Sequence, residues 1–270
     1  MKGFTKGFII SSLAYLVFTG ILGAAFIPIS NIPNDIAIST YGLLVSVVHS
    51  FLLGFVTMMI FGVSYHLIPL FSERDFYSPF LAFIHLALSN IGTLGIIIFM
   101  LFLNYAVVKI SALIVVLSLL VFVFNMFFTF LSSPRQSEIH NPFGKGDKEA
   151  DKAAINFTRW SIIYLLIGCP LGAAMFFKPA LIADFRPIHA HINLMGFVSL
   201  MIFGVSYHMF PRFAQRPLFS VKMARWQFWL ANIGLIGMAI SWWFAGSVSS
   251  AGRHSYFRTH RNSGRLPLCL

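Results

Sequence analysis

Apolar residues in this chain form long runs that charged residues seldom interrupt. A helix needs about 20 apolar residues to cross a bilayer core of about 30 Å, and seven gaps between successive Asp, Glu, Lys and Arg residues are long enough. The predicted spans are residues 7–27, 42–68, 78–103, 110–131, 159–178, 186–212 and 225–253. The pattern therefore predicts an all-α integral membrane protein with seven clear transmembrane helices.

The second and sixth spans carry closely similar sequences. Residues 49–71 read HSFLLGFVTMMIFGVSYHLIPLF and residues 191–213 read HINLMGFVSLMIFGVSYHMFPRF, identical at 15 of 23 positions with a constant offset of 142. The same offset pairs Asn90 with Asn232, Gly92 with Gly234, and Gly95 with Gly237. Such internal similarity is typical of membrane proteins built from repeats. One repeat then holds four helices, and we expect two parallel repeats related by a pseudo-rotation about the membrane normal.

The repeat divides the chain into four parts. We expect a first four-helix repeat over residues 1–134, a cytoplasmic linker over 135–157, a second repeat of three helices over 158–246 and a polar basic tail over 247–270. A complete second repeat calls for an eighth span after residue 246, where the tail instead carries four Arg and no acidic residue. We interpret the eighth helix as missing or replaced, for example by a frameshift. The alternative is an authentic divergent tail.

Composition agrees with a membrane protein. Only 10% of the residues are charged, against about 25% in soluble domains, which argues against an ordinary soluble enzyme. The net charge of +11 does not indicate a nucleic-acid partner, because the basic residues flank apolar runs. With a cytoplasmic N-terminus, twelve Lys and Arg lie in inside segments and only Lys109, Lys178 and Arg186 lie in the outside loops, as the positive-inside rule expects. The four Arg of the tail would lie outside, against this trend. We therefore predict a plasma or inner membrane location with the N-terminus in the cytoplasm. Two cysteines without a CxxC motif support neither a disulfide scaffold nor a zinc ribbon.

Histidines are the ionisable residues within the spans, where such groups are costly and usually functional. The six are His49, His66, His85, His189, His191 and His208. The repeat makes His49 and His191 equivalent in helix and in depth, and two imidazoles facing each other are what a bis-histidine haem iron requires. Gly54 and Gly196, five positions further on, are expected to leave room for a macrocycle, or to allow close helix contact. The alternative for the two histidines is a polar packing contact.

His189 and His191 form the motif H-A-H. Side chains two residues apart point about 200° apart around a helix, so the two histidines can serve two sites on opposite faces but not one iron from one face. The first repeat has Val47 at the position of His189. A histidine ligand that is present in only one of the two repeats predicts a haem with an open distal position, where a small gas could bind. The alternative is an interfacial residue close to Arg186.

The remaining histidines carry weaker signals. His66 and His208 lie 17 residues beyond the first pair, about 25 Å along a helix, and therefore near the cytoplasmic face. They are lower-ranked metal ligands, and a polar interface with lipid headgroups is the favoured interpretation. His85 aligns with Gln227 and is interpreted as a packing or hydrogen-bonding residue.

The segment HAHINLMGFVSLMIFGVSYHMFPRF resembles the HxH helix of haem–copper oxidase subunit I, particularly cbb3-type and nitric-oxide-reductase-like members. The resemblance covers most of residues 7–246, with its specific motifs in spans two and six. It implies that His189 is the ligand of a high-spin haem, and that His191 and His49 are the ligands of a low-spin haem. Two four-helix repeats would then correspond to two of the family's three helical arcs.

The resemblance implies one haem b, or two, and an oxidoreductase of the cytochrome c oxidase or nitric oxide reductase type. Copper is not supported, because the family's His-His dyad and the third arc are missing. The implied work is electron transfer, or binding or reduction of O2 or NO, with cytochrome c or quinol as donor. Another membrane subunit or a second copy is an expected partner. A small transporter with central histidines and a non-catalytic gas sensor or assembly subunit are the alternatives.

Overall fold

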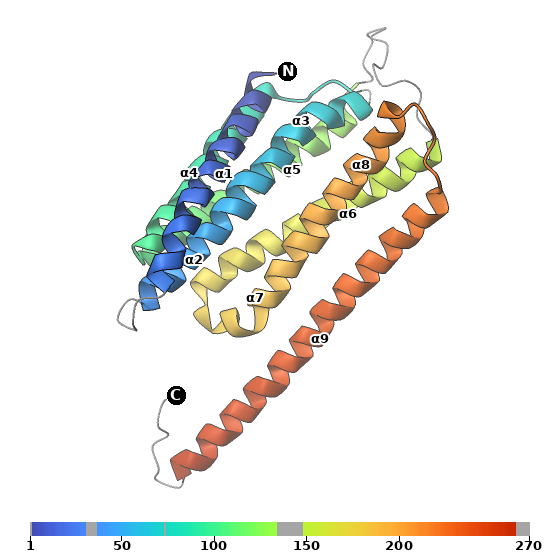
Figure 1. Cartoon of the computed structure of the whole chain (residues 1–270). Coiled ribbons are helices and arrows are strands. Elements are labelled where there is room, and N and C mark those ends of the chain that lie inside the picture. Colours follow the sequence, from blue (N-terminus) through green and yellow to red (C-terminus); the bar gives the residue numbers. More distant parts are fainter. Residues whose placement is uncertain (1, 31–36, 73, 134–147, 263–270) are drawn as a thin grey trace.

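The computed structural model describes residues 2–30, 37–72, 74–133 and 148–262, and this part of the chain is built of helices (Figure 1). In the first half these are α1 (Gly3–Ser30), α2 (Ala37–His49), η2 (Ser50–Thr57), α3 (Met58–Phe71), α4 (Pro79–Leu101) and α5 (Tyr105–Leu131). In the second half they are α6 (Lys148–Phe177), η3 (Pro179–Leu181), α7 (Ile182–His191), η4 (Ile192–Ser199), α8 (Leu200–Phe213) and α9 (Val221–Asn262).

Seven helical stretches among the described residues are long and apolar enough to cross a membrane, as the sequence predicted. The second stretch joins α2, η2 and α3, and the sixth joins η3, α7, η4 and α8. The protein is therefore an all-α integral membrane protein. Its orientation across the membrane stays a prediction from the distribution of Lys and Arg.

Helices extend into the expected linker and into the expected tail. Helix α6 begins at Lys148, so the last ten residues of the expected linker are helical. Glu149 and Asp151 lie in its first turn, where negative charge is favourable, and alanines follow them. Residues 134–147 and 263–270 lie outside the described part of the chain, and α9 continues to Asn262.

The two halves pack side by side. Helices α1 to α5 form one group, α6 to α9 form the other, and α5 packs against α6 between them (Figure 1). One hydrophobic cluster is built around Phe8, Phe61 and Phe122 in the first half, and a smaller one around Phe157 and Phe228 in the second. Helix α9, orange in Figure 1, lies at the edge of the second group, against α7 and α6.

Equivalent positions of the two halves make equivalent contacts. The hydroxyl of Ser12 lies 3.9 Å from the sulfur of Met59, and the hydroxyl of Ser161 lies 3.8 Å from the sulfur of Met201. Met59 and Met201 are related by the same offset of 142 that relates the two similar spans. The similarity in sequence therefore corresponds to a similarity in packing.

Gly54 and Gly196 serve helix contact. A Cβ at Gly54 would lie 2.5 Å from Cγ of Tyr15, and a Cβ at Gly196 would lie 2.5 Å from Cγ of Tyr164. The space beside each glycine is thus filled by a tyrosine from α1 or α6. The expectation that these glycines leave room for a macrocycle is wrong, and the alternative of close helix contact is confirmed.

Candidate functional site

A cavity of about 260 Å³ lies between the two halves of the molecule. Its walls come from α2 and η2 of the first half and from α6, α7 and η4 of the second, with further residues from α4 and α5. Most of the lining side chains are apolar, among them Leu53, Ile96 and Phe197. The polar groups that line it include His49, His189, Asn193 and Arg186. The cavity is therefore an apolar space with a few convergent polar groups, the usual character of a ligand site.

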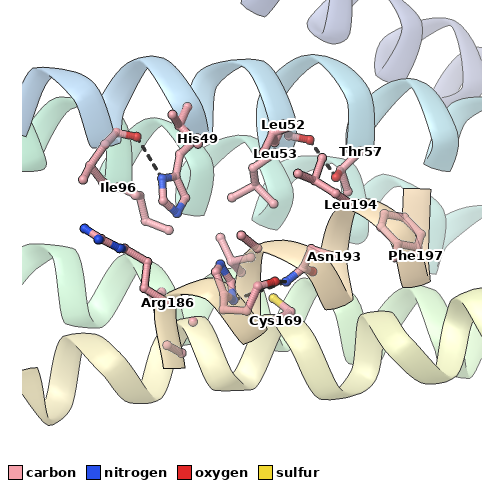
Figure 2. Close-up of a pocket in the computed structure, with 18 of the residues that line it drawn as sticks. His49, Leu52, Leu53, Thr57, Ile96, Cys169, Arg186, Asn193, Leu194 and Phe197 are labelled. Carbon is pink, nitrogen blue, oxygen red and sulfur yellow. Dashed lines mark hydrogen bonds between the residues drawn. The ribbon is translucent and has the colours of Figure 1, made fainter. Parts of the chain in front are cut away.

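His49 is the last residue of α2, directly before the π-helical segment η2. Its Nδ1 lies 2.8 Å from the backbone oxygen of Val45, one turn earlier. Because a carbonyl oxygen only accepts, Nδ1 carries the proton and donates it there. Figure 2 shows the ring of His49 directed into the space whose far side carries Arg186, Asn193 and Cys169. This tautomer leaves Nε2 as the basic nitrogen of the imidazole.

His189 approaches the same cavity from the second half. Its Nδ1 lies 2.9 Å from the backbone oxygen of Gly168 on α6 and donates its proton there. The side-chain amide of Asn193 donates to the backbone oxygen of His189 at 2.8 Å. His49 and His189 thus line one cavity from opposite sides, each with Nδ1 held by a backbone carbonyl.

Two glycines of α6 make room for the His189 side of the cavity. A Cβ at Gly172 would lie 2.5 Å from Cε1 of His189, and a Cβ at Gly168 would lie 2.5 Å from Nδ2 of Asn193. Larger residues at either position would displace the imidazole or the amide. Sequence analysis missed both glycines. Their spacing of four residues, which places them on one face of a helix, is the signal that could have revealed them.

His191 points away from this cavity. Its ring centroid lies 5.6 Å from that of Trp242 on α9, and its Nδ1 lies 2.8 Å from the backbone oxygen of Pro187. Sequence reasoning expected His49 to face His191, but the residue that shares the cavity with His49 is His189. The difference follows from helix geometry, since residues two apart point in nearly opposite directions and here the His189 direction faces the first half.

His66 and His208 lie apart from the cavity, and neither is among its lining residues. Nδ1 of His208 lies 2.8 Å from Oδ1 of Asp151, in a polar cluster that also contains Arg212. His66 is exposed. Among the residues that the structure describes, no group of three or more His, Cys, Asp or Glu could hold a metal ion.

His85 is a buried hydrogen-bonding residue, in agreement with its interpretation from sequence. Its Nδ1 lies 2.9 Å from the hydroxyl of Tyr65. The equivalent Tyr207 donates to Oε1 of Gln227. Both pairs join neighbouring helices of their own halves and are therefore structural.

A family comparison places this geometry in context. Residues 106–263, more than half of the chain, match the family described as cytochrome c and quinol oxidase polypeptide I. The chain belongs to the cytochrome c and quinol oxidase polypeptide I family. The matched region includes His189 and His191, while His49 lies outside it.

Members of the oxidase polypeptide I family are also found among individual relatives. Over 59 residues the chain is 37% identical to cytochrome c oxidase subunit 1 of Rhodobacter capsulatus and 32% identical to the cbb3-type cytochrome c oxidase subunit CcoN1 of Stutzerimonas stutzeri. The first alignment covers 22% of this chain and 11% of the relative, and the second covers 22% and 12%. The chain thus matches about a tenth of the length of these oxidase subunits.

Proposed function

We propose that this member of the oxidase polypeptide I family binds haem b in the cavity between its two halves, with His49 and His189 as iron ligands. Its work at this haem would be electron transfer, because both imidazoles would hold the iron; binding or reduction of O2 or NO would require a haem held by one histidine. The observation that carries the proposal is that two imidazoles from opposite halves line one apolar cavity. The donor of electrons would be cytochrome c or a quinol, as the family resemblance implies.

The donor set fits haem iron. Neutral imidazole is a common axial ligand, and ligating histidines usually donate their other N–H to a carbonyl, which fixes the tautomer and the ring orientation. His49 and His189 both do so, through Val45 and Gly168. A haem held by both imidazoles would supply one-electron transfer.

The chain's own residues would hold and orient the group. Gly168 and Gly172 keep the space that Asn193 and His189 occupy, since a Cβ at either position would overlap them. Arg186 lines the same cavity and contributes a positive charge, which suits the carboxylates of a haem. The apolar walls would exclude water from the iron.

His191 is a further candidate ligand. Its Nδ1 is hydrogen-bonded to the backbone oxygen of Pro187, one turn earlier, as Nδ1 of His49 is to that of Val45. The family resemblance implies a haem role for it. Because it faces Trp242 on α9, we propose that it would serve a second haem rather than the one between His49 and His189. His66 and His208 are not included as ligands in this proposal.

Reduced-minus-oxidised spectra of the full chain, purified in detergent after expression with excess haem, test the proposal. We expect Soret and α bands whose bis-imidazole signal is lost in His49→Ala and in His189→Ala and is retained in His191→Ala. His66→Ala, which changes an exposed histidine, is the matched control. Absence of haem bands from the unaltered chain would reject haem binding. Loss of the bis-imidazole signal in His191→Ala, with retention in His189→Ala, would instead assign the pair to His49 and His191.

A further inference from the structure

A second cavity, also of about 260 Å³, lies between α6 and α9. The two helices begin beside each other at one end of the molecule (Figure 1), and the cavity lies along their first turns. Three residues of each helix line it, which are Lys152, Ala153, Asn156, Arg225, Phe228 and Trp229. Both helices are apolar enough to span a membrane, from Glu149 and from Val221 onward. The α6–α9 cavity therefore lies at the depth of the lipid headgroups.

The floor of the α6–α9 cavity is apolar and its rim is cationic. Phe228 is buried, and its ring centroid lies 5.2 Å from that of Phe157 on α6. Lys152, Arg225 and Trp229 are exposed at the rim. Tryptophan is enriched where a membrane meets water, because its ring combines an apolar body with a polar N–H. Such a surface suits a ligand with an anionic group and an apolar body.

Glu149 brings the two cations of the rim together. One of its carboxylate oxygens accepts a hydrogen bond from Nζ of Lys152 at 2.7 Å, and the other accepts one from Nη2 of Arg225. Each cation keeps further donors, because an ammonium has three N–H groups and a guanidinium has five. Two positive charges against one negative charge leave the rim cationic. The first turn of α9 has no acidic residue, so the positive end of its dipole adds to this charge.

The repeat provides an internal comparison for the α6–α9 cavity. Helix α1 corresponds to α6 with the offset of 149 that relates Tyr15 to Tyr164, and α4 corresponds to α9 with the offset of 142. The first-half counterparts of four lining residues, Lys152, Asn156, Arg225 and Phe228, are Gly3, Gly7, Phe83 and Leu86. Two glycines and two apolar residues thus stand where the second half has a lysine, an amide, an arginine and a phenylalanine.

The equivalent place between α1 and α4 is closed by direct contact. A Cβ at Gly7 would lie 2.5 Å from Cδ2 of Leu86, and a Cβ at Gly3 would lie 3.5 Å from Cζ of Phe83. Glycines at these positions allow the two helices to pack tightly, as small residues do in membrane helix pairs. A cavity is therefore not a general property of this helix pair, because it depends on the polar and charged residues that the second half alone carries here.

We propose that the α6–α9 cavity binds one anionic membrane phospholipid. Its phosphate would accept hydrogen bonds from the guanidinium of Arg225, whose planar fork matches two phosphate oxygens, and from the ammonium of Lys152. The amide of Asn156 would donate to a further oxygen. Phe228 and Trp229 would contact the glycerol and the start of an acyl chain. The site is independent of haem binding.

The charge and position of the cavity determine the class of lipid. A zwitterionic headgroup brings its own ammonium to the rim, where Lys152 and Arg225 already exceed the charge of Glu149. An anionic headgroup brings the missing negative charge, and basic pockets between membrane helices bind such headgroups. A soluble phosphate has no apolar part to cover the floor at Phe228. The lipid is therefore favoured over the free anion.

Native mass spectrometry of the full chain in non-ionic detergent tests the proposal, with phosphatidylglycerol as the probe. Phosphatidylcholine with the same acyl chains is the comparison. We expect one phosphatidylglycerol to saturate the chain at about a tenth of the concentration that phosphatidylcholine requires, equivalent to about 1.4 kcal/mol. Arg225→Gln and Lys152→Gln should each remove this preference. Asn156→Trp, which fills the cavity without changing its charge, should weaken the binding of phosphatidylglycerol as well.

Lys222→Gln is the matched control. Lys222 is exposed at the start of α9 and does not line the cavity, so this variant loses the same charge and should keep the preference. Circular dichroism checks that all variants retain their helix content. Equal binding of the two lipids by the unaltered chain would overturn the proposal, as would an equal loss in Lys222→Gln, which would indicate general attraction to the basic end. Displacement of phosphatidylglycerol by excess inorganic phosphate would assign the site to a soluble anion and would also overturn it.

Discussion

Nδ1 of His189 lies 2.9 Å from the backbone oxygen of Gly168, so that α6 orients the imidazole of α7 across the wall of the cavity. One turn further along α6, Gly172 provides the space for the ring itself. Helix α6 therefore sets both the tautomer and the position of His189. The proposed haem binding therefore depends on a residue that is not itself an iron ligand.

Gly172→Ala tests this dependence. The new Cβ would lie 2.5 Å from Cε1 of His189, so the ring must move away from its carbonyl partner. We expect about 10- to 100-fold weaker haem binding, as for other changes around metal ligands. The haem affinity is measured by titrating the purified protein with haem and recording its absorption. Gly20→Ala in α1 is the control, because a Cβ there meets nothing within 4 Å; equal loss of affinity in both variants would refute the role of Gly172.

The spans could be predicted from sequence because the bilayer imposes one simple requirement, a long uncharged helix. The opposite directions of His189 and His191 also followed from helix geometry, and they are confirmed by the cavity on one side and Trp242 on the other. Which of the two shares a cavity with His49 could not be predicted. That choice depends on how the second half is rotated against the first, and this rotation is set by packing between residues far apart in the chain.

The π-helical segments were a second feature beyond the reach of sequence analysis. Both begin directly after a histidine, η2 after His49 and η4 after His191. Their apolar residues show no period that distinguishes a π-helix from an α-helix. In the structure, the side-chain hydroxyls of Thr57 and Ser199 donate to backbone oxygens five residues earlier, at 2.8 and 2.9 Å. Short π-helical segments within α-helices often lie at functional sites. Here each of them begins directly after a candidate ligand.

Tyr65→Phe is expected to destabilise the first half of the protein. His85 is fully buried, with Phe8, Phe61 and Phe122 around its ring, and loss of the phenol leaves its Nδ1 without the partner at 2.9 Å. We expect a loss of about 1–2 kcal/mol in the free energy of unfolding.

The matched change in the second half is Tyr207→Phe. Its partner Gln227 lies on the less covered helix α9 and is only partly buried, so the loss should be smaller. Thermal unfolding in detergent, followed by circular dichroism, compares the two variants. A larger effect at Tyr207 than at Tyr65 would contradict the structural role assigned to His85.

Arg212→Ala is expected to weaken the contact between α6 and α8. The guanidinium of Arg212 donates to both carboxylate oxygens of Asp151, at 2.7 and 2.8 Å, and to the backbone oxygen of His208 at 2.8 Å. Its removal leaves a partly buried carboxylate without its main partner, at a cost of about 2–4 kcal/mol. Lys152→Ala, in an ion pair whose lysine is 71% exposed, should cost about 0–1 kcal/mol. Similar unfolding temperatures for both variants would show that the buried pair contributes little.

Gly95→Ala and Gly237→Ala should change stability in opposite directions, although the two glycines are equivalent in the repeat. At position 95 the Cβ would lie 2.1 Å from the hydroxyl oxygen of Ser111, and overpacking of this kind costs about 1–3 kcal/mol. At position 237 the Cβ enters open space, so the better helix propensity of alanine should stabilise α9 by up to about 1 kcal/mol. Thermal unfolding of the purified full chain measures both. Destabilisation by Gly237→Ala would contradict the open surroundings of this glycine.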